Sequence, residues 1–367
     1  MLESITLGMM ERGHEVDVLA FGEPLYPGCG EFDRVQPYRI FRVPASGHRS
    51  KEILAMAIKL MAAASSKRYD VIFCGVAWSS ALLALLPKYL RRIPFIIYTH
   101  GEDTTVVVGS KWKESLMRQA FRHSSGLMTN SNFSKEAVER QGGRAGICEV
   151  LYPTIDSRPF LEVQEGQSAE LIERLGLKNC RLLLTVARLQ RRKGHDTVVR
   201  CLPALAAQFP DVHYVVLGKG DRAELTELAK ELNVLDRLTI IDYISENDLP
   251  VLYRSASVHV MVSRWDPEAQ EVEGFGMAYL EAAAAGKPSV AGNHGGASDA
   301  VVNGSTGITV DPTSVEQTAD AIARLLADPT LASEMGLAGQ ARAMKEFSTK
   351  HFLDTIEDRL VKAAKST

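Results

Sequence analysis

The sequence lacks the features of disulfide-rich, zinc-binding or nucleic-acid-binding proteins. Its five cysteines are scattered through 367 residues, without a CxxC pair or a His/Cys ligand spacing. Neither a disulfide framework nor a zinc site is therefore indicated. The net charge is only −3, so no basic excess is available to attract nucleic acid. A reducing cytoplasm is the expected compartment.

Long hydrophobic runs are lacking as well. The most apolar helical stretch, residues 53–64, contains Lys59 and falls well short of the ~20 residues that cross a bilayer. The chain begins Met1-Leu-Glu3 without a basic start, and no apolar core follows before Glu11, so no signal peptide is predicted. We expect a cytoplasmic protein whose closest approach to lipid is peripheral contact with the inner face of the membrane.

The small net charge conceals an uneven distribution. Residues 1–160 contain 20 Lys and Arg against 16 Asp and Glu, which gives +4, and the remainder contains 22 against 29, which gives −7. A basic half suits an anionic acceptor or an anionic membrane. Lys111, Trp112, Lys113, Arg118 and Arg122 are spaced to form either an amphipathic surface helix or an ordinary solvated helix face.

The most informative stretch is Glu273-Gly-Phe-Gly-Met-Ala-Tyr-Leu-Glu281. Gly274 and Gly276 let the backbone approach a ligand, and the free N–H groups at the start of the following helix suit a phosphate. Glu273 and Glu281 would then accept hydrogen bonds from hydroxyls at either end of the same ligand. A nucleotide-sugar has this layout, although an ordinary Ala-rich core helix would also fit the pattern.

A second candidate group lies upstream. Residues 181–187 are predicted to form a buried strand, and Arg188 and Lys193 follow it before the helical pattern of residues 197–208. Both cations therefore leave the carboxyl end of a strand, where open α/β sheets bind ligands. Such a pair would neutralise a diphosphate leaving group. Arg191 and Arg192 are interpreted as solvated loop charges.

Together these motifs resemble those of the retaining enzymes of glycosyltransferase family 4, which have the two-domain α/β architecture called GT-B. The resemblance covers nearly the whole chain. Seven further segments follow the order typical of the family: Arg12-Gly-His-Glu-Val16, His100-Gly101, Asn130-Ser131, Tyr152-Pro-Thr-Ile-Asp156, Gly218-Lys-Gly220, Ser245-Glu-Asn-Asp-Leu249 and Gly295-Gly296.

The resemblance implies roles for particular residues in donor binding. Arg188 and Lys193 would bind the donor diphosphate, Glu281 the ribose hydroxyls, and Glu273 the sugar hydroxyls near the reacting carbon. Gly218 and Gly220, which close the strand predicted at residues 213–217, would let the base or ribose approach. The start of the motif helix would contact the sugar and phosphate through Gly274, Phe275, Gly276 and Met277.

The acceptor side of the site is expected in the first half of the chain. His100 follows the strand predicted at residues 95–98, and by resemblance it would bind the donor sugar as a catalytic residue. Glu102 and Asp103 beside it are candidate acceptor contacts.

The implied reaction transfers a hexosyl group from a UDP-, GDP- or ADP-linked sugar to a hydroxyl of a glycolipid, polysaccharide or small molecule, with retention of configuration. No cofactor is expected. The family generally needs no metal, and the sequence contains no Asp-x-Asp pair that would bind one.

Strands alternate with helices throughout, which is typical of parallel, doubly wound sheets. We predict two Rossmann-like domains: an acceptor-binding domain over residues 1–165 and a nucleotide-sugar-binding domain over residues 166–345. Residues 346–367 are expected to form a helix that returns to the first domain. The predicted strands are residues 15–21, 39–43, 71–75, 95–98, 126–129 and 148–152, followed by 181–187, 213–217, 238–241, 258–262, 289–291 and 307–310.

The resemblance also implies a gap at the beginning. Family members start with a strand and a glycine-rich loop before the helix that ends in Arg-Gly-His-Glu-Val, whereas this chain starts inside that helix. We therefore expect the first strand and its loop to be missing from this sequence, either because the true start lies upstream or because the N-terminal half has rearranged. Because that strand is central in a doubly wound sheet, its absence would leave the edges of its neighbours unpaired.

Three alternatives remain open. A Rossmann dehydrogenase would require a G-x-G-x-x-G motif between its first strand and helix, which is not evident. A sugar-nucleotide epimerase of the same architecture is closer, but the Glu273/Glu281 motif favours transfer. A degenerate binding protein, which keeps the nucleotide-sugar site but lacks the glycine-rich loop and catalysis, is the third alternative.

Overall fold

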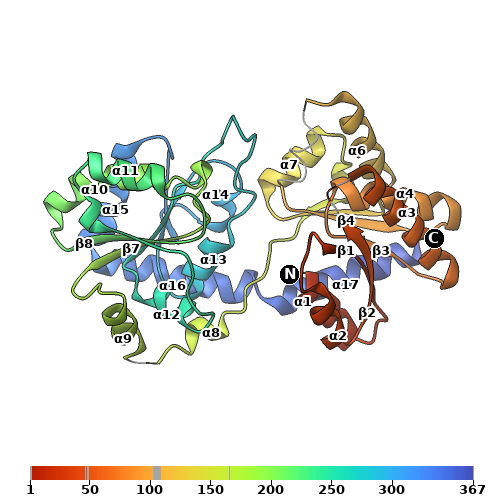
Figure 1. The fold of residues 1–367 in the computed structure, drawn as a ribbon, viewed down its shortest axis with the longest axis horizontal. Coiled ribbons are helices and arrows are strands. Elements are labelled where there is room, and N and C mark those ends of the chain that lie inside the picture. Colours follow the sequence, from red (N-terminus) through yellow and green to blue (C-terminus); the bar gives the residue numbers. More distant parts are fainter. Residues whose placement is uncertain (1, 46, 48, 102–108, 165, 367) are drawn as a thin grey trace. The chain divides into compact units, whose positions relative to one another are not determined.

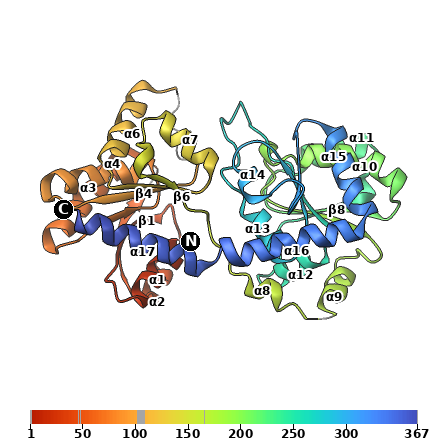
Figure 2. The ribbon, with the colours of Figure 1, turned by 180° about the vertical axis from the view of Figure 1, so that it is seen from behind.

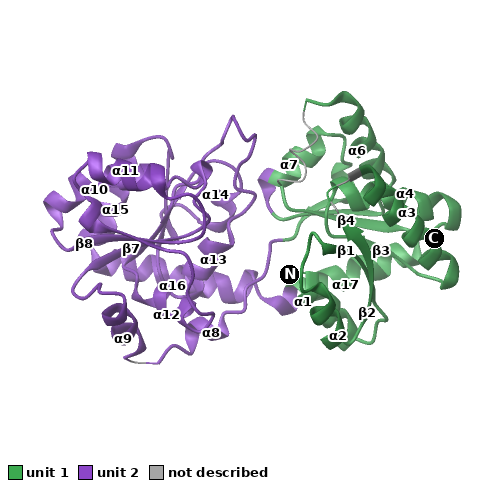
Figure 3. Cartoon of the chain, viewed as in Figure 1, with its two compact units in different colours: residues 1–130, 134–151, 352–367 green, residues 131–133, 152–351 purple. Residues whose placement is uncertain are grey.

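The computed structural model describes residues 2–45, 47, 49–101, 109–164 and 166–366. The chain divides into two compact units (Figure 3). Unit 1 comprises Met1–Asn130, Ser134–Leu151 and Phe352–Thr367, and unit 2 comprises Ser131–Phe133 and Tyr152–His351. The main change from unit 1 to unit 2 therefore falls near residue 151.

All six strands predicted for the first half of the chain are present (Figure 1). They lie in two separate parallel ladders, one of β1 and β2 and one with the order β3-β4-β5-β6. Among the described residues, β1 pairs only with β2, and β3 pairs only with β4. The strands of unit 1 are β1 Asp17–Pro24, β2 Arg39–Ala45, β3 Ile72–Cys74, β4 Phe95–Thr99, β5 Gly126–Thr129 and β6 Cys148–Val150.

Helices cover both faces of the four-stranded sheet (Figure 2). α4 and α6 pack small and aromatic side chains, such as Ala81 and Phe121, on one face, and α1 and α17 cover the other. α3 packs on β2 through Met56 and Val43. The helices here are α1 Leu2–Glu11, α2 Cys29–Val35, α3 Arg49–Ser66, α4 Trp78–Arg91, α6 Lys111–His123, α7 Asn132–Arg140, a short 3-10 helix Ala145–Ile147 and α17 Thr349–Lys365.

The C-terminal helix belongs to the core of unit 1. Phe352 and Ile356, one turn apart on α17, are buried. They pack in one cluster with Ile5 and Met9 of α1 and with Tyr98 of β4. The Phe352 and Tyr98 rings lie 6.0 Å apart in an edge-to-face arrangement. Arg12 at the end of α1 donates to Glu357 at 2.5 Å, which ties the two helices together at the surface. The helical spacing of apolar residues near the C-terminus therefore reflects burial in unit 1.

Unit 2 contains one continuous parallel sheet with the order β12-β11-β10-β7-β8-β9. All six strands predicted for this half are present: β7 Arg181–Val186, β8 Val212–Leu217, β9 Leu238–Ile241, β10 Val258–Met261, β11 Ser289–Gly292 and β12 Gly307–Val310. The first strand, β7, is central, and the chain adds strands first to one side of it and then to the other. The strand order therefore reverses between β7 and β10, at the position where open α/β sheets bind ligands.

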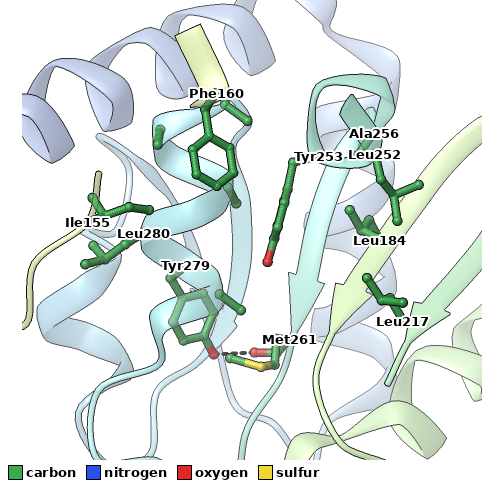
Figure 4. Packing of buried hydrophobic residues seen from close by; sticks show 14 of the residues in the cluster. Ile155, Phe160, Leu184, Leu217, Leu252, Tyr253, Ala256, Met261, Tyr279 and Leu280 are labelled. Carbon is green, nitrogen blue, oxygen red and sulfur yellow. Dashed lines mark hydrogen bonds between the residues drawn. The ribbon is translucent and has the colours of Figure 1, made fainter. Parts of the chain in front are cut away.

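Two helical layers cover this sheet. α10, α11 and α15 pack on one face, and α8, α9, α12, α13 and α16 pack on the other. Figure 4 shows the second layer, in which Tyr253, Tyr279 and Phe160 fill the space between the helices and the sheet. The helices are α8 Arg158–Leu161, α9 Gln167–Arg174, α10 His195–Gln208, α11 Ala223–Glu231, α12 Asp248–Ser255, α13 Met277–Ala284, α14 Ala297–Ala300, α15 Val315–Ala327 and α16 Pro329–Glu346, with short 3-10 helices Arg191–Lys193 and Leu235–Arg237.

None of the helices that the structure describes combines the length and apolar character needed to span a membrane.

Candidate active site

The candidate residues of unit 2 meet at the carboxyl edge of its sheet. Arg188 and Lys193 follow β7, and Glu273 lies in the long segment between β10 and α13. β10 and β7 are adjacent and parallel, with Val258 paired to Leu183. Both segments therefore leave the sheet at the same edge and at the strand reversal, although 80 residues separate Lys193 from Glu273.

An ion pair connects the two segments. The Lys193 ammonium group contacts Oε2 of Glu273, and both side chains are almost completely buried. Gly194, which follows Lys193, has a φ of +74° and packs so closely on β10 that a Cβ atom would lie 2.3 Å from the carbonyl oxygen of Val262. Only glycine combines this backbone conformation with so close an approach, so Gly194 fixes the backbone position of Lys193 beside β10.

Arg192 is a second cation at the same carboxylate. Its side chain is 3% exposed, its Nη1 lies 3.5 Å from Oε2 of Glu273, and its Nε lies 3.1 Å from Oε2 of Glu271. The interpretation of Arg192 as a solvated loop charge is therefore wrong. The 3-10 turn directs it into the protein, whereas Arg191, one position earlier, is 66% exposed and lies 3.4 Å from Glu268.

Glycine opens the motif helix. Gly276 precedes α13 with a φ of +95°, a conformation that side-chain-bearing residues rarely adopt. Phe275 is buried, and its ring lies 5.5 Å from the ring of Tyr152 and 5.7 Å from that of Phe347. The packed Phe275 ring holds the backbone of Gly274 and Gly276 in place. It thereby fixes the position of the first N–H groups of α13, which have no acceptor within the helix.

Glu281 lies inside α13 and is mostly buried. Oε2 of Glu281 accepts a 2.6 Å hydrogen bond from the hydroxyl of Tyr253, a fully buried residue of α12. Burial raises the pKa of Glu281 above its ordinary value, and the Tyr253 hydrogen bond opposes this shift. Tyr279, a buried tyrosine of α13 itself, donates instead to the carbonyl oxygen of Met261 (Figure 4).

A cavity of about 310 Å³ lies where β7, β8 and β9 end at the carboxyl edge of the sheet. Arg188 and Gly218 both line it, so two residues that the sequence assigned to the donor are brought together. The segment after β9 also lines it. Ser245 and Glu246 belong to the Ser245–Leu249 segment that follows the family order, whereas no motif marked Asp242, Tyr243 and Ile244. The lining residues of this segment are Asp242, Tyr243, Ile244, Ser245 and Glu246.

The other donor candidates of unit 2 lie outside the lining of that cavity: Lys193, Gly220, Glu273, Gly274, Phe275, Gly276, Met277 and Glu281. Gly220 follows β8, where its backbone packs against Leu189. Met277, the first residue of α13, is exposed.

Among the residues that the structure describes, no group of three or more His, Cys, Asp or Glu side chains is arranged to hold a metal ion.

His100 is the candidate that unit 1 contributes. It follows β4, where its Nε2 bonds to the carbonyl oxygen of Gly75 at 3.1 Å, and Asn130 donates to its backbone oxygen at 2.9 Å. Because a carbonyl oxygen only accepts, Nε2 carries the proton in this arrangement. Glu102 and Asp103, the acceptor candidates, lie outside the described residues.

Two parallel α/β units of this kind define the GT-B class, and solved structures share the fold. The HepE protein of Anabaena, in complex with UDP and glucose, has a TM-score of 0.80 at 22% identity, covering 98% of this chain and 95% of its own. Sucrose-phosphate synthase of Thermosynechococcus elongatus has a TM-score of 0.80 at 21% identity, covering 100% and 93%.

Sequence comparison identifies the family. The family model for Glycosyltransferase Family 4 matches residues 1–158, and the model for Glycosyl transferases group 1 matches residues 168–342. A GDP-mannose-dependent alpha-(1-6)-phosphatidylinositol monomannoside mannosyltransferase of Mycolicibacterium smegmatis is 30% identical over 347 residues, which cover 92% of this chain and 88% of the relative. The chain therefore belongs to glycosyltransferase family 4, and the resemblance stated from its motifs is confirmed.

Proposed function

We propose that this glycosyltransferase moves a hexosyl group from a nucleotide-sugar to an acceptor hydroxyl with retention of the anomeric configuration. The observation that supports this best is the buried contact of Lys193 and Glu273 at the strand reversal of unit 2. A cation for a phosphate and a carboxylate for sugar hydroxyls are thereby held beside each other before any donor arrives. Such preorganisation contributes most where charge develops during a reaction.

The donor-binding roles follow from the chemistry of each group. The diphosphate takes the N-terminal end of α13, where N–H groups and the helix dipole favour an anion, with Arg188 and Lys193 as counterions. The nucleoside occupies the cavity lined by Arg188 and Gly218. The carboxylate of Glu281, which accepts a hydrogen bond from Tyr253, also accepts hydrogen bonds from the ribose hydroxyls.

The transfer step requires no separate base on the protein. The bond between the anomeric carbon and the leaving phosphate oxygen breaks, and a bond from the acceptor oxygen to the same carbon forms on the same face. The acceptor proton passes to the leaving phosphate. Arg188 and Lys193 stabilise the diphosphate charge that develops, and Glu273 holds the sugar hydroxyls. Unit 1 contributes the acceptor site and His100, which the family resemblance assigns to the donor sugar.

The relatives suggest a particular donor and acceptor. The mannosyltransferases of Mycolicibacterium smegmatis and Corynebacterium glutamicum are named as GDP-mannose-dependent enzymes that act on phosphatidylinositol monomannoside or its monoacylated form. We propose GDP-mannose as the donor and a mannosylated inositol lipid as the acceptor. The enzyme would then work as a peripheral protein at the cytoplasmic face of the membrane.

The test is a donor screen with product analysis. GDP-mannose, UDP-glucose and ADP-glucose are each incubated with the protein and phosphatidylinositol monomannoside, and nucleoside diphosphate release and product linkage are measured. The proposal is supported if GDP is released and the sugar in the product has the same anomeric configuration as in the donor. A free sugar epimer would instead indicate an epimerase, and thermal stabilisation by the nucleotide without any transfer would indicate a binding protein.

A further inference from the structure

The segment between β10 and α13 carries the one tryptophan of unit 2, Trp265, which the proposed reaction does not use. Its side chain is 43% exposed. Single exposed apolar side chains are normal on a protein surface, so exposure alone assigns no role to it. What distinguishes Trp265 is that the backbone on both sides of it is fixed at the edge of the candidate active site.

The backbone at the indole is tied to two neighbouring segments of the sheet edge. The N–H of Arg264 donates to the carbonyl oxygen of Arg192 at 2.8 Å, in the turn after β7. The N–H of Trp265 donates to Nδ1 of His294 at 3.3 Å, in the segment after β11. The guanidinium group of Arg264 also bonds to Asp196 of α10 at 3.0 Å. Trp265 therefore follows β10 and is held by the segments after the two strands beside it.

The segment then returns to the donor carboxylate. Asp266 and Glu271 exchange two backbone hydrogen bonds, of 2.8 and 3.2 Å, which close residues 267–270 into a tight turn. The side chain of Glu271 pairs with Arg192 at 3.1 Å. Glu273, the proposed ligand of the sugar hydroxyls, follows two residues later. The exposed indole and this carboxylate therefore belong to one closed loop whose two ends are fixed.

Two polar groups accompany the indole. Because the backbone N–H of Trp265 only donates, Nδ1 of His294 accepts, and the neutral ring carries its proton on Nε2 as a donor. Asp266 accepts through Oδ1 from the N–H groups of Glu268 and Ala269, at 3.1 and 3.2 Å, and none of the described residues donates to its Oδ2. The loop therefore offers an apolar ring face, a hydrogen-bond donor and a hydrogen-bond acceptor.

This combination suits the ring of a sugar. One face of a hexopyranose presents C–H groups with a partial positive charge, which the electron-rich face of an indole attracts. The rim of the sugar presents hydroxyls, each of which can donate and accept. Small-molecule sites generally combine aromatic surface with a few placed polar groups. An anionic ligand fits less well, since residues 265–273 contain four carboxylates and no lysine or arginine.

We propose that Trp265 stacks on a pyranose ring of the acceptor, whose hydroxyls bond to His294 and Asp266. In the proposed reaction Glu273 holds the donor hexosyl group, and the acceptor oxygen must approach the anomeric carbon of that group to within bonding distance. The acceptor ring therefore lies against the loop that carries Glu273. This inference rests on the proposed function and deepens it, because it makes Trp265 a specificity-determining residue for a glycosylated acceptor.

The kinetic test measures transfer to phosphatidylinositol monomannoside in detergent. Trp265→Ala should raise the KM for this acceptor by about tenfold and change kcat by less than about threefold, because a stacking surface is lost and the donor groups remain. Trp265→Phe keeps a flat aromatic face and should recover most of the affinity. Leu235→Ala removes a side chain of unit 2 that is similarly exposed, at 42%, and should leave the KM for the acceptor unchanged.

Two kinetic outcomes would overturn the proposal. If Trp265→Ala raises the KM for the nucleotide-sugar and not the KM for the acceptor, the ring that stacks on Trp265 is the donor's. If Trp265→Ala and the parent chain have the same KM for the acceptor, the indole makes no contact that matters for acceptor binding.

Sugar binding is also measured without transfer. In a Trp78→Phe, Trp112→Phe variant Trp265 is the only tryptophan, and its fluorescence is titrated with methyl α-mannopyranoside and with sorbitol, an acyclic polyol that has no ring face. We expect a saturable change with the mannoside only. No change, or the same change with both compounds, would contradict stacking on a pyranose.

The two measurements separate this inference from the proposed function. If the mannoside changes the fluorescence of Trp265 but the chain transfers sugar from no nucleotide-sugar, the sugar subsite stands and the proposed function fails. If the chain transfers sugar and the mannoside leaves the fluorescence unchanged, the proposed function stands and the subsite fails.

Discussion

The candidate site residues are positioned in different ways in the two units. In unit 2 a continuous six-stranded sheet brings the segments after β7 and β10 to one point, where Lys193 and Arg192 contact Glu273. In unit 1 the strands lie in two ladders, and His100 is placed by Gly75 and Asn130 at the end of β4. The difference shows that the continuous sheet of unit 2 brings together charged side chains from segments 80 residues apart, whereas His100 in unit 1 is placed by groups that follow the two strands beside its own.

The largest expected effect tests the charge pair of unit 2. Replacing Lys193 by Ala should lower kcat for sugar transfer by about 100- to 1000-fold, because a preorganised cation is lost where the diphosphate develops charge. Steady-state transfer from the preferred donor measures this. Arg191→Ala removes an exposed cation two positions earlier and should change kcat by less than about twofold. Equal effects of the two substitutions would contradict the assignment of Lys193.

The second prediction tests whether the C-terminal helix stabilises unit 1. Phe352→Ala should lower the free energy of unfolding of unit 1 by about 3–5 kcal/mol, since a fully buried ring is removed. Urea unfolding can be followed by Trp78 and Trp112 in a Trp265→Phe background, because the chain has three tryptophans. Leu337→Ala, on the exposed side of α16, is the matched control. An unchanged unfolding transition of these two tryptophans would refute the assignment of α17 to the core of unit 1.

The third prediction concerns the pH dependence of unit 2. Burial lowers the pKa of His259 from 6.5 to about 3, so it stays neutral in the folded state while the unfolded chain binds a proton below 6.5. Stability from this group is therefore complete above pH 6.5 and is lost as the pH falls. Between pH 7 and 5 the loss should be about 2 kcal/mol.

His259→Asn provides the comparison for that measurement. The variant should unfold with a smaller pH dependence than the parent chain over the same interval. His195 and His213, whose pKa values burial also lowers, contribute in the same direction and remain in both proteins. An unchanged slope in the variant would show that His259 is not the buried titrating group.

The smallest expected effect sharpens the role of Glu281. Tyr253→Phe removes the hydroxyl that stabilises the Glu281 carboxylate, so the pKa of Glu281 should rise further. Nucleotide affinity should fall by about fivefold, equivalent to about 1 kcal/mol, and its loss on acidification should begin at a higher pH. Isothermal titration calorimetry across a pH series measures both changes. Tyr279→Phe, which removes a buried hydroxyl bonded to Met261, should leave the pH profile unchanged.

Much of the fold could be predicted from the sequence because each strand is a short apolar run between turn residues. The strands predicted at residues 181–187 and 258–262 correspond to β7 and β10, which flank the strand reversal. The sequence also marked Lys193 and Glu273 as candidates through their motifs, without showing that they touch. Their contact depends on which strands are neighbours, and β7 and β10 are separated by two other strands in the chain.

Other features could not be predicted because they depend on direction and packing. Arg191 and Arg192 are adjacent and chemically identical, yet one is exposed and the other is buried beside two glutamates. Tyr253 carries no motif, and only the packing of α12 against α13 brings its hydroxyl to Glu281.

The sequence by itself determined the order of strands and helices, the glycine-opened helix of the motif, and family membership, because these are encoded in local patterns and short motifs. The tertiary structure alone decided which strands are neighbours within each sheet, the Lys193–Glu273 contact and the cavity lined by Arg188 and Gly218. These features depend on contacts between residues far apart in the chain. Such residues interact only once the folded sheet has brought them close together.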